Sequence, residues 1–253
     1  MPSIDGITIQ GRRAGQPAQF ADVRETVDVA ATVRDAETPL EELVYQWTAT
    51  TGTFSGTGRA VTWTAPNSAA TPPGLVTITL KVIENYGHPG QPKIYSQDVT
   101  RTQTLALHDS VREVGDMAVR FLTEFSKPQT NQAWQDIMKD FKASACPDPG
   151  EFESERLDVV RHYSFFFMHT YQIQPATVSV NFGGACSFRG RRGDACASVP
   201  VFWDSTDSRD GTRRIATGID HLAAAYSPAD SRWWLCSSDF QSFSNFGHAF
   251  YSR

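Results

Sequence analysis

The first part of the chain carries hydrophobic residues at the spacing of β-strands. Over residues 76–82, Val, Ile, Leu and Val alternate with polar side chains, so one face of a strand is expected to be buried and the other to face water. Similar runs occur at residues 7–9, 27–33, 43–48 and 60–64. Segments rich in Gly, Pro and Ser separate them, which is typical of turns. Residues 1–106 are therefore predicted to form an all-β sandwich.

The pattern changes after residue 106. Ser110 and Glu113 match a capping box, and apolar residues then recur at three- and four-residue steps as far as Phe125, which indicates an amphipathic helix. Two shorter helices are expected, one over residues 134–141 and one from residue 154. Strand patterns follow at residues 165–173, 176–182, 194–203, 215–226 and 232–239. Helices followed by antiparallel strands are typical of an α+β domain.

Two segments in the first half resemble a known family. Residues 45–54 read Tyr-Gln-Trp-Thr-Ala-Thr-Thr-Gly-Thr-Phe and residues 61–66 read Val-Thr-Trp-Thr-Ala-Pro, which is similar to bacterial immunoglobulin-like domains of the polycystic-kidney-disease (PKD) type. The resemblance covers residues 20–100 and implies an immunoglobulin-like sandwich. Such modules serve as spacers or as adhesion and carbohydrate-binding accessories. We expect Trp47 and Trp63 to lie in the core; the alternative is an exposed sugar-binding platform.

The end of the chain resembles a second family. Residues 220–226 read Asp-His-Leu-Ala-Ala-Ala-Tyr, and after a Pro-Ala-Asp turn residues 231–235 read Ser-Arg-Trp-Trp-Leu. This looks like the last hairpin of the nuclear-transport-factor-2-like (NTF2-like) superfamily, also called SnoaL-like. The resemblance implies an α+β cone over residues 107–253, with helices packed on a curved antiparallel sheet around a pocket. The chain departs from the family in its extra cysteines and its aromatic tail.

All four cysteines lie in the second half. Cys186 and Cys196 are symmetric about the polar turn at residues 189–193, so a hairpin would place them opposite each other, within reach of a disulfide. Cys146 and Cys236 would then form the second bridge. The other pairings, and four buried free thiols, stay open as alternatives. Disulfides favour an oxidising compartment, so we expect an extracytoplasmic protein: periplasmic, cell-surface or secreted.

Composition restricts the class of partner. The net charge of -5 lacks the basic footprint of a nucleic-acid-binding protein, so we expect no nucleic-acid partner. No apolar run reaches the ~18–20 residues that a membrane-spanning helix needs, so no transmembrane segment is predicted. The first residues show no basic and then apolar leader, which is expected of a cytoplasmic protein or, equally, of the mature form of an exported protein whose leader was removed.

Few residues are candidates for catalysis. Asp220, His162 and Tyr163 are the candidate acid–base groups if the second domain encloses a pocket. Asp220 and His221 are neighbours on an alternating strand and face opposite sides, which excludes them as a dyad. For each lone His or Asp, a structural or surface role is the ordinary alternative. No cofactor fingerprint is present, and the His and Cys spacings match no standard metal site, so neither a cofactor nor a metal is predicted.

Two surface features are predicted to bind partners. The polar turn at residues 189–193 carries basic side chains suited to binding carboxylates or phosphates: Arg189, Arg191 and Arg192. A solvated hairpin end is the alternative. The tail carries aromatic residues at helical spacing, expected to pack on their own domain or on a partner: Phe243, Phe246 and Phe250.

The combined pattern predicts an exported, non-enzymatic binding or assembly protein, such as a surface, periplasmic or lipoprotein-type subunit with a protein partner. One alternative is a small-molecule isomerase, dehydratase or hydrolase that binds an apolar ligand in the pocket of the second domain. The other alternative is a carbohydrate-binding accessory module.

Overall fold

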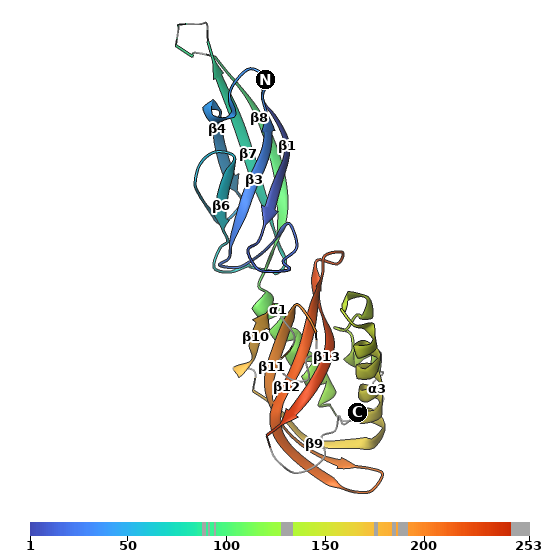
Figure 1. Ribbon diagram of the computed structural model, residues 1–253. Coiled ribbons are helices and arrows are strands. Elements are labelled where there is room, and N and C mark those ends of the chain that lie inside the picture. Colours follow the sequence, from blue (N-terminus) through green and yellow to red (C-terminus); the bar gives the residue numbers. More distant parts are fainter. Residues whose placement is uncertain are drawn as a thin grey trace. The chain divides into compact units, whose positions relative to one another are not determined.

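The chain forms two compact units, Met1–Asp109 and Ser110–Arg253 (Figure 1). The computed structural model describes residues 1–87, 90, 92–93, 95–127, 134–174, 177–183, 186 and 192–243. The predicted domain boundary after residue 106 falls inside β8 (Tyr95–His108), the last strand of the first unit.

The first unit contains two four-stranded sheets. One has the strand order β1-β3-β6-β5 and the other β2-β8-β7-β4. Their bounds are β1 Ser3–Gln10, β2 Phe20–Asp22, β3 Thr26–Arg34, β4 Val44–Ala49, β5 Thr53–Ser55, β6 Ala60–Thr64, β7 Gly74–Tyr86 and β8 Tyr95–His108, with a 3-10 turn, η1, at Leu40–Glu42. β2 runs parallel to β8, whereas the other pairs of these sheets are antiparallel.

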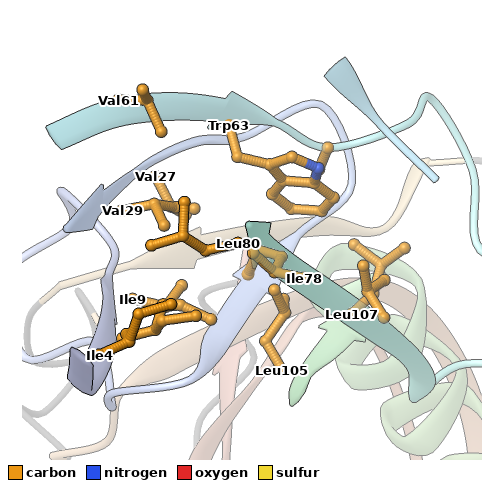
Figure 2. Close-up of a cluster of buried hydrophobic side chains, with 14 of the residues drawn as sticks. Ile4, Ile9, Val27, Val29, Val61, Trp63, Ile78, Leu80, Leu105 and Leu107 are labelled. Atoms are coloured by element: carbon orange, nitrogen blue, oxygen red, sulfur yellow. The ribbon is translucent and has the colours of Figure 1, made fainter. Parts of the chain in front are cut away.

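Side chains from both sheets meet in one hydrophobic core. The four apolar side chains at even positions of 76–82 in β7 are buried, as their alternation predicts. Trp63 of β6 packs over them and is completely buried (Figure 2). Its Nε1 donates to the carbonyl of Thr51 at 3.0 Å, and Nε1 of the partly buried Trp47 donates to the carbonyl of Gly58 at 2.9 Å. Both tryptophans therefore stabilise the core, and they form no exposed sugar platform.

The second unit is a curled sheet with helices against it (Figure 1). The strand order is β10-β11-β12-β13, and β9 pairs with the part of β11 that β10 leaves open. The bounds are β9 Phe166–Ile173, β10 Ser179–Phe182, β11 Ala195–Asp207, β12 Arg213–Ser227 and β13 Arg232–Ser242; the helices are α1 Ser110–Phe125, α2 Trp134–Ile137 and α3 Pro149–Phe165, with a 3-10 turn, η2, at Ala143–Ala145. α1 packs on β10, β11 and β13, and α3 on β13 and β9.

The predicted fold class, an immunoglobulin-like sandwich followed by an α+β cone, is wrong. Of the residues that the structure describes, 50% lie in strands and 20% in helices, and the second unit is a curled half-barrel sheet. In the part of the chain that the structure describes there are three α-helices, and α2 has four residues where a short helix over residues 134–141 was expected. The strands are longer than the hydrophobic pattern indicates, since β12 spans 15 residues and β7 spans 13. Alternation alone missed these extensions because they include polar residues.

No helix in the described ranges is long and apolar enough to cross a membrane.

A candidate functional site in the second unit

A small cavity lies between the helices and the curled sheet of the second unit. Its volume is about 30 Å³, above the roughly 10–15 Å³ that a cavity needs to hold a water molecule. The lining residues come from α1, α3 and four strands: Phe125, His162, Met168, Tyr171, Trp203, Asp220 and Phe240. Three of these side chains are polar or titratable, and the others are apolar.

Aromatic rings line this cavity. Trp203 of β11 lies against Phe240 of β13, with ring centroids 5.9 Å apart, and both side chains are buried. Phe125 at the end of α1 meets the edge of Tyr171 of β9 at 6.4 Å. Aromatic pairs at these distances are favourable contacts beyond the area that they bury. The aromatic rings therefore pack against one another in the wall of the cavity.

Asp220 of β12 is a buried carboxyl at the cavity. Its Oδ1 accepts a hydrogen bond from Oγ of Ser238 at 2.7 Å. Burial raises the pKa of Asp220 to about 6; the negative charge of Asp239 adds to the rise, and the hydrogen bond from Ser238 opposes it. Asp220 is therefore partly protonated near neutral pH.

Glu155 of α3 is a second buried carboxyl, and the sequence analysis missed it. Its Oε2 accepts a hydrogen bond from the backbone N–H of Ser238 at 2.8 Å. Burial raises its pKa well above the ordinary value, and the negative charge of Asp220 raises it further. The spacing of Glu155, Val159 and His162 could have indicated its burial, because residues four and three positions apart share one face of a helix. All three side chains are buried.

His162 of α3 lies at the cavity in a packed environment. Its ring stacks on Phe125 with the centroids 3.9 Å apart. Burial lowers the pKa of His162 to about 3, and a hydrogen bond to the backbone of Phe125 opposes this shift. The ring is therefore neutral at physiological pH. The structure brings His162 and Asp220 to one cavity, whereas the side chain of Tyr163 lies outside the described residues.

Tyr171 completes the polar lining. Burial raises the pKa of its hydroxyl well above the ordinary value, and the negative charge of Asp220 raises it further. The phenol therefore stays protonated at physiological pH.

His221 belongs to the opposite face of the sheet. Its Nδ1 lies 3.0 Å from Oγ of Ser198, and its Nε2 lies 3.0 Å from Oε1 of Gln241. Both ring nitrogens therefore have partners on the neighbouring strands β11 and β13. This arrangement holds the imidazole within the sheet, away from the cavity and from Asp220.

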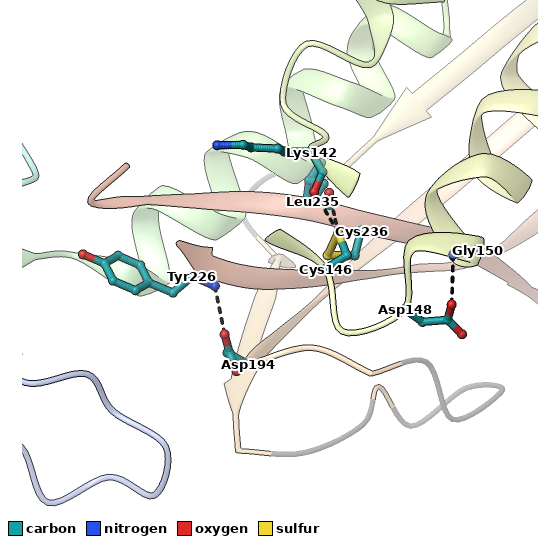
Figure 3. The surroundings of a disulfide bond; sticks show 8 residues. All are labelled: Lys142, Cys146, Asp148, Gly150, Asp194, Tyr226, Leu235 and Cys236. Carbon is teal, nitrogen blue, oxygen red and sulfur yellow. Dashed lines mark hydrogen bonds between the residues drawn. A yellow bond between two sulfur atoms is a disulfide. The ribbon is translucent and has the colours of Figure 1, made fainter. Parts of the chain in front are cut away.

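The four cysteines form two disulfides, Cys146–Cys236 (Figure 3) and Cys186–Cys196. The sequence analysis paired Cys186 with Cys196 because a hairpin would place them opposite each other, and this reason is wrong. In the ladder of β10 with β11, Cys196 lies opposite Asn181, and Cys186 lies beyond the end of β10.

The pairing of β13 with β12 contains a bulge that the sequence analysis did not predict. β13 shifts its register between the partners of Ala223 and Ala224, so Cys236 is the extra residue of a β-bulge.

The predicted binding residues are only partly covered by the structure. Arg192 is exposed, and Phe243 just after β13 exposes 62% of its surface. The other members of the two predicted binding surfaces lie outside the described residues: Arg189, Arg191, Phe246 and Phe250.

Among the residues with described positions, no three His, Cys, Asp or Glu side chains are grouped so that they could hold a metal ion. The resemblances to PKD-type and NTF2-like domains stay predictions, carried by the quoted residues alone. Comparisons of the chain with protein-family models, with curated proteins and with solved structures find no match.

Proposed function

We propose that this chain is an extracytoplasmic binding or assembly protein, and that the cavity of the second unit belongs to its core. The observation that carries the proposal is the size of the cavity. Pockets for small molecules usually measure about 300–1,000 Å³, whereas this one has about 30 Å³ and is lined mostly by aromatic rings. A substrate of several non-hydrogen atoms would have to displace Trp203, Phe240 or Tyr171.

The polar groups at the cavity also have structural partners. Asp220 and Glu155 both accept hydrogen bonds from Ser238, and His162 stacks on Phe125. Buried polar groups in folded proteins ordinarily have hydrogen-bond partners of this kind. The bond from Ser238 joins α3 to the sheet, and the stacking of His162 on Phe125 joins α3 to α1. This supports a role for them in stability.

The disulfides support the compartment that we propose. Structural disulfides persist in oxidising environments and are rare in the cytosol. Cys146–Cys236 closes a separation of 90 residues and Cys186–Cys196 one of 10, and all four residues are buried. Phe243, a large aromatic side chain left exposed, supports a protein partner as the ligand.

A second candidate function is favoured by Asp220. A carboxyl with a pKa of about 6 suits general acid–base catalysis near neutral pH. In that case the protein is a small-molecule enzyme, and the aromatic wall must open to admit a substrate.

Indole binding distinguishes the two candidates. We expect millimolar indole to leave the melting temperature of the wild-type protein unchanged, because the cavity does not admit it. Trp203→Ala should lower the melting temperature, and indole should partly restore it by filling the space that the ring leaves. Trp234→Ala is the matched control, since Trp234 lies on β13 outside the cavity lining and should create no indole site.

Stabilisation of the wild-type protein by indole would contradict a closed cavity and favour the enzyme. The compartment is tested separately by counting thiols in protein isolated from its own cells, denatured without reductant. We expect no free thiols; four would remove the argument for export.

A further inference from the structure

The first unit has four edge strands among its described residues. β1 and β5 are the edges of one sheet, and β2 and β4 are the edges of the other. An edge strand exposes unpaired backbone N–H and C=O groups that can pair with another chain. Proteins block such pairing with short strands, bulges, prolines and charged side chains.

Three of these edges carry such protection. β2 and β5 have three residues each. β1 has a register shift between Ile4 and Gly6, and the residue between them, Asp5, forms an ion pair with Arg34 at 2.6 Å. These features limit the ladder that a second chain could form along β1, β2 or β5.

The fourth edge, β4, carries none of them. Its six residues, Val-Tyr-Gln-Trp-Thr-Ala, include no charge and no proline. Its pairing with β7 is continuous from Val44 opposite Ile83 to Ala49 opposite Ile78, without a bulge. Its other edge is therefore a regular, uncharged template for another strand.

A groove adjoins the start of this strand. It measures about 530 Å³ and lies between β4 with η1 and the segment before β6; its lining is Leu40, Glu41, Leu43, Val44, Tyr45, Thr57, Gly58 and Arg59. The hydroxyl of Tyr45 donates to the carbonyl of Leu40 at 2.9 Å, which fixes the ring in the groove. Glu41 and Arg59 are exposed, and neither forms an ion pair with another residue in the described part of the chain.

We propose that two copies of this chain associate through β4, edge to edge and antiparallel, as a two-fold symmetric dimer. A two-fold interface must be complementary to itself. β4 meets this condition because an uncharged strand brings no like charges together when it pairs with its own copy. The groove of each copy carries one acidic and one basic side chain, Glu41 and Arg59, so it adds no net charge to the interface.

Sedimentation equilibrium over a concentration series tests the dimer. We expect the wild-type chain to show a reversible monomer–dimer equilibrium. Thr48→Lys puts a charge on the edge strand, and it should weaken association at least about tenfold, which is about 1.4 kcal/mol. Thr79→Lys is the matched control: Thr79 lies opposite Thr48 on the inner strand β7, so the same change should leave association unaffected.

Cross-linking tests the position of the interface. All four native cysteines are paired, so one introduced cysteine is the only free thiol. Gln46→Cys on β4 should give a disulfide-linked dimer on mild oxidation. Lys81→Cys, at the position opposite Gln46 on β7, should not.

A wild-type chain that stays monomeric at all concentrations overturns the inference and leaves the proposed function standing. A dimer that tolerates Thr48→Lys and does not cross-link at position 46 also overturns it, because the interface then lies elsewhere.

Discussion

Glu155 of α3 and Asp220 of β12 are held by the same residue, Ser238 of β13. Its backbone N–H donates to Glu155 at 2.8 Å, and its hydroxyl donates to Asp220 at 2.7 Å. Two buried carboxyls so close cannot both ionise without a large electrostatic cost. The contact between α3 and the sheet is therefore most stable when this pair is protonated.

Stability should fall as the pH rises through this pair. The pKa of Asp220 is about 6 in the folded protein, above its ordinary value of 3.8, so the folded state binds the proton more tightly than the unfolded state. Its contribution is fully present below pH 3.8 and is lost as the pH rises to about 6; Glu155 acts in the same direction. From Asp220 alone we expect a loss of about 2 kcal/mol between pH 4.5 and 7, measured by urea unfolding.

Groups such as Asp207 make the free energy of unfolding rise with pH instead. Its ion pair with Arg209 lowers its pKa to about 2, so its contribution is lost only as the pH falls below about 4. A free energy of unfolding that is constant or rises between pH 4.5 and 7 would contradict the role assigned to Asp220 and Glu155.

Asp220→Asn should stabilise the protein at neutral pH. The amide oxygen still accepts the hydrogen bond from Ser238, and the buried group no longer ionises. We expect a gain of about 1–3 kcal/mol at pH 7.5 and little change at pH 4. The control is Asp204→Asn on the adjacent strand, which should destabilise, because Asp204 forms an ion pair with Arg213 at 2.6 Å. If both variants changed the free energy of unfolding in the same direction, the buried charge of Asp220 would not be what destabilises the protein at neutral pH.

Removing the two disulfides should cost different amounts. Cross-linking restricts the unfolded chain more when the closed loop is longer. The separation of 90 residues in Cys146–Cys236 predicts a loss of roughly 5 kcal/mol on replacing both cysteines by Ala, and the separation of 10 in Cys186–Cys196 predicts roughly 3 kcal/mol. Urea unfolding of the two double variants measures the difference. Equal losses would mean that local packing, and not loop length, sets the contribution.

Gly52→Ala should destabilise the first unit. Gly52 has a φ of 78°, and an added Cβ would lie 2.5 Å from the ring of Trp63 and 2.6 Å from the carbonyl oxygen of Thr64. We expect a loss of about 2–4 kcal/mol, by thermal or urea unfolding. Gly58→Ala is the control: its φ is 86°, but no atom lies within 4 Å of the added Cβ, so only about 1 kcal/mol of backbone strain is expected.

Local patterns in the sequence predicted individual elements better than the fold. Alternation over residues 76–82 identified β7, and helical spacing identified α1. β8 was missed because its residues from 95 to 104 are mostly polar, and it exists as a strand through its long pairing with β7. Strand length therefore depends on a partner that the alternation of one segment does not show.

The candidate site was partly predictable. Asp220 and His162 were named from residue type, but no local pattern places residues 58 positions apart at one cavity. Glu155 was overlooked because a charged residue in a helix usually faces water. Its spacing with Val159 and His162 would have placed it on the buried face. The closure of the cavity by Trp203 and Phe240 depends on packing between strands, which the sequence does not display.

The two disulfides share a buried cluster with Ala223 and Ala225 on β12. β-branched residues usually suit the middle of a strand better than alanine. Here the methyl groups of a valine would have to occupy volume that the sulfur atoms already fill. Ala223 and Ala225 therefore cannot be replaced by the β-branched residues that strand propensity favours. Oxidative folding of the second unit should be sensitive to a valine at either position.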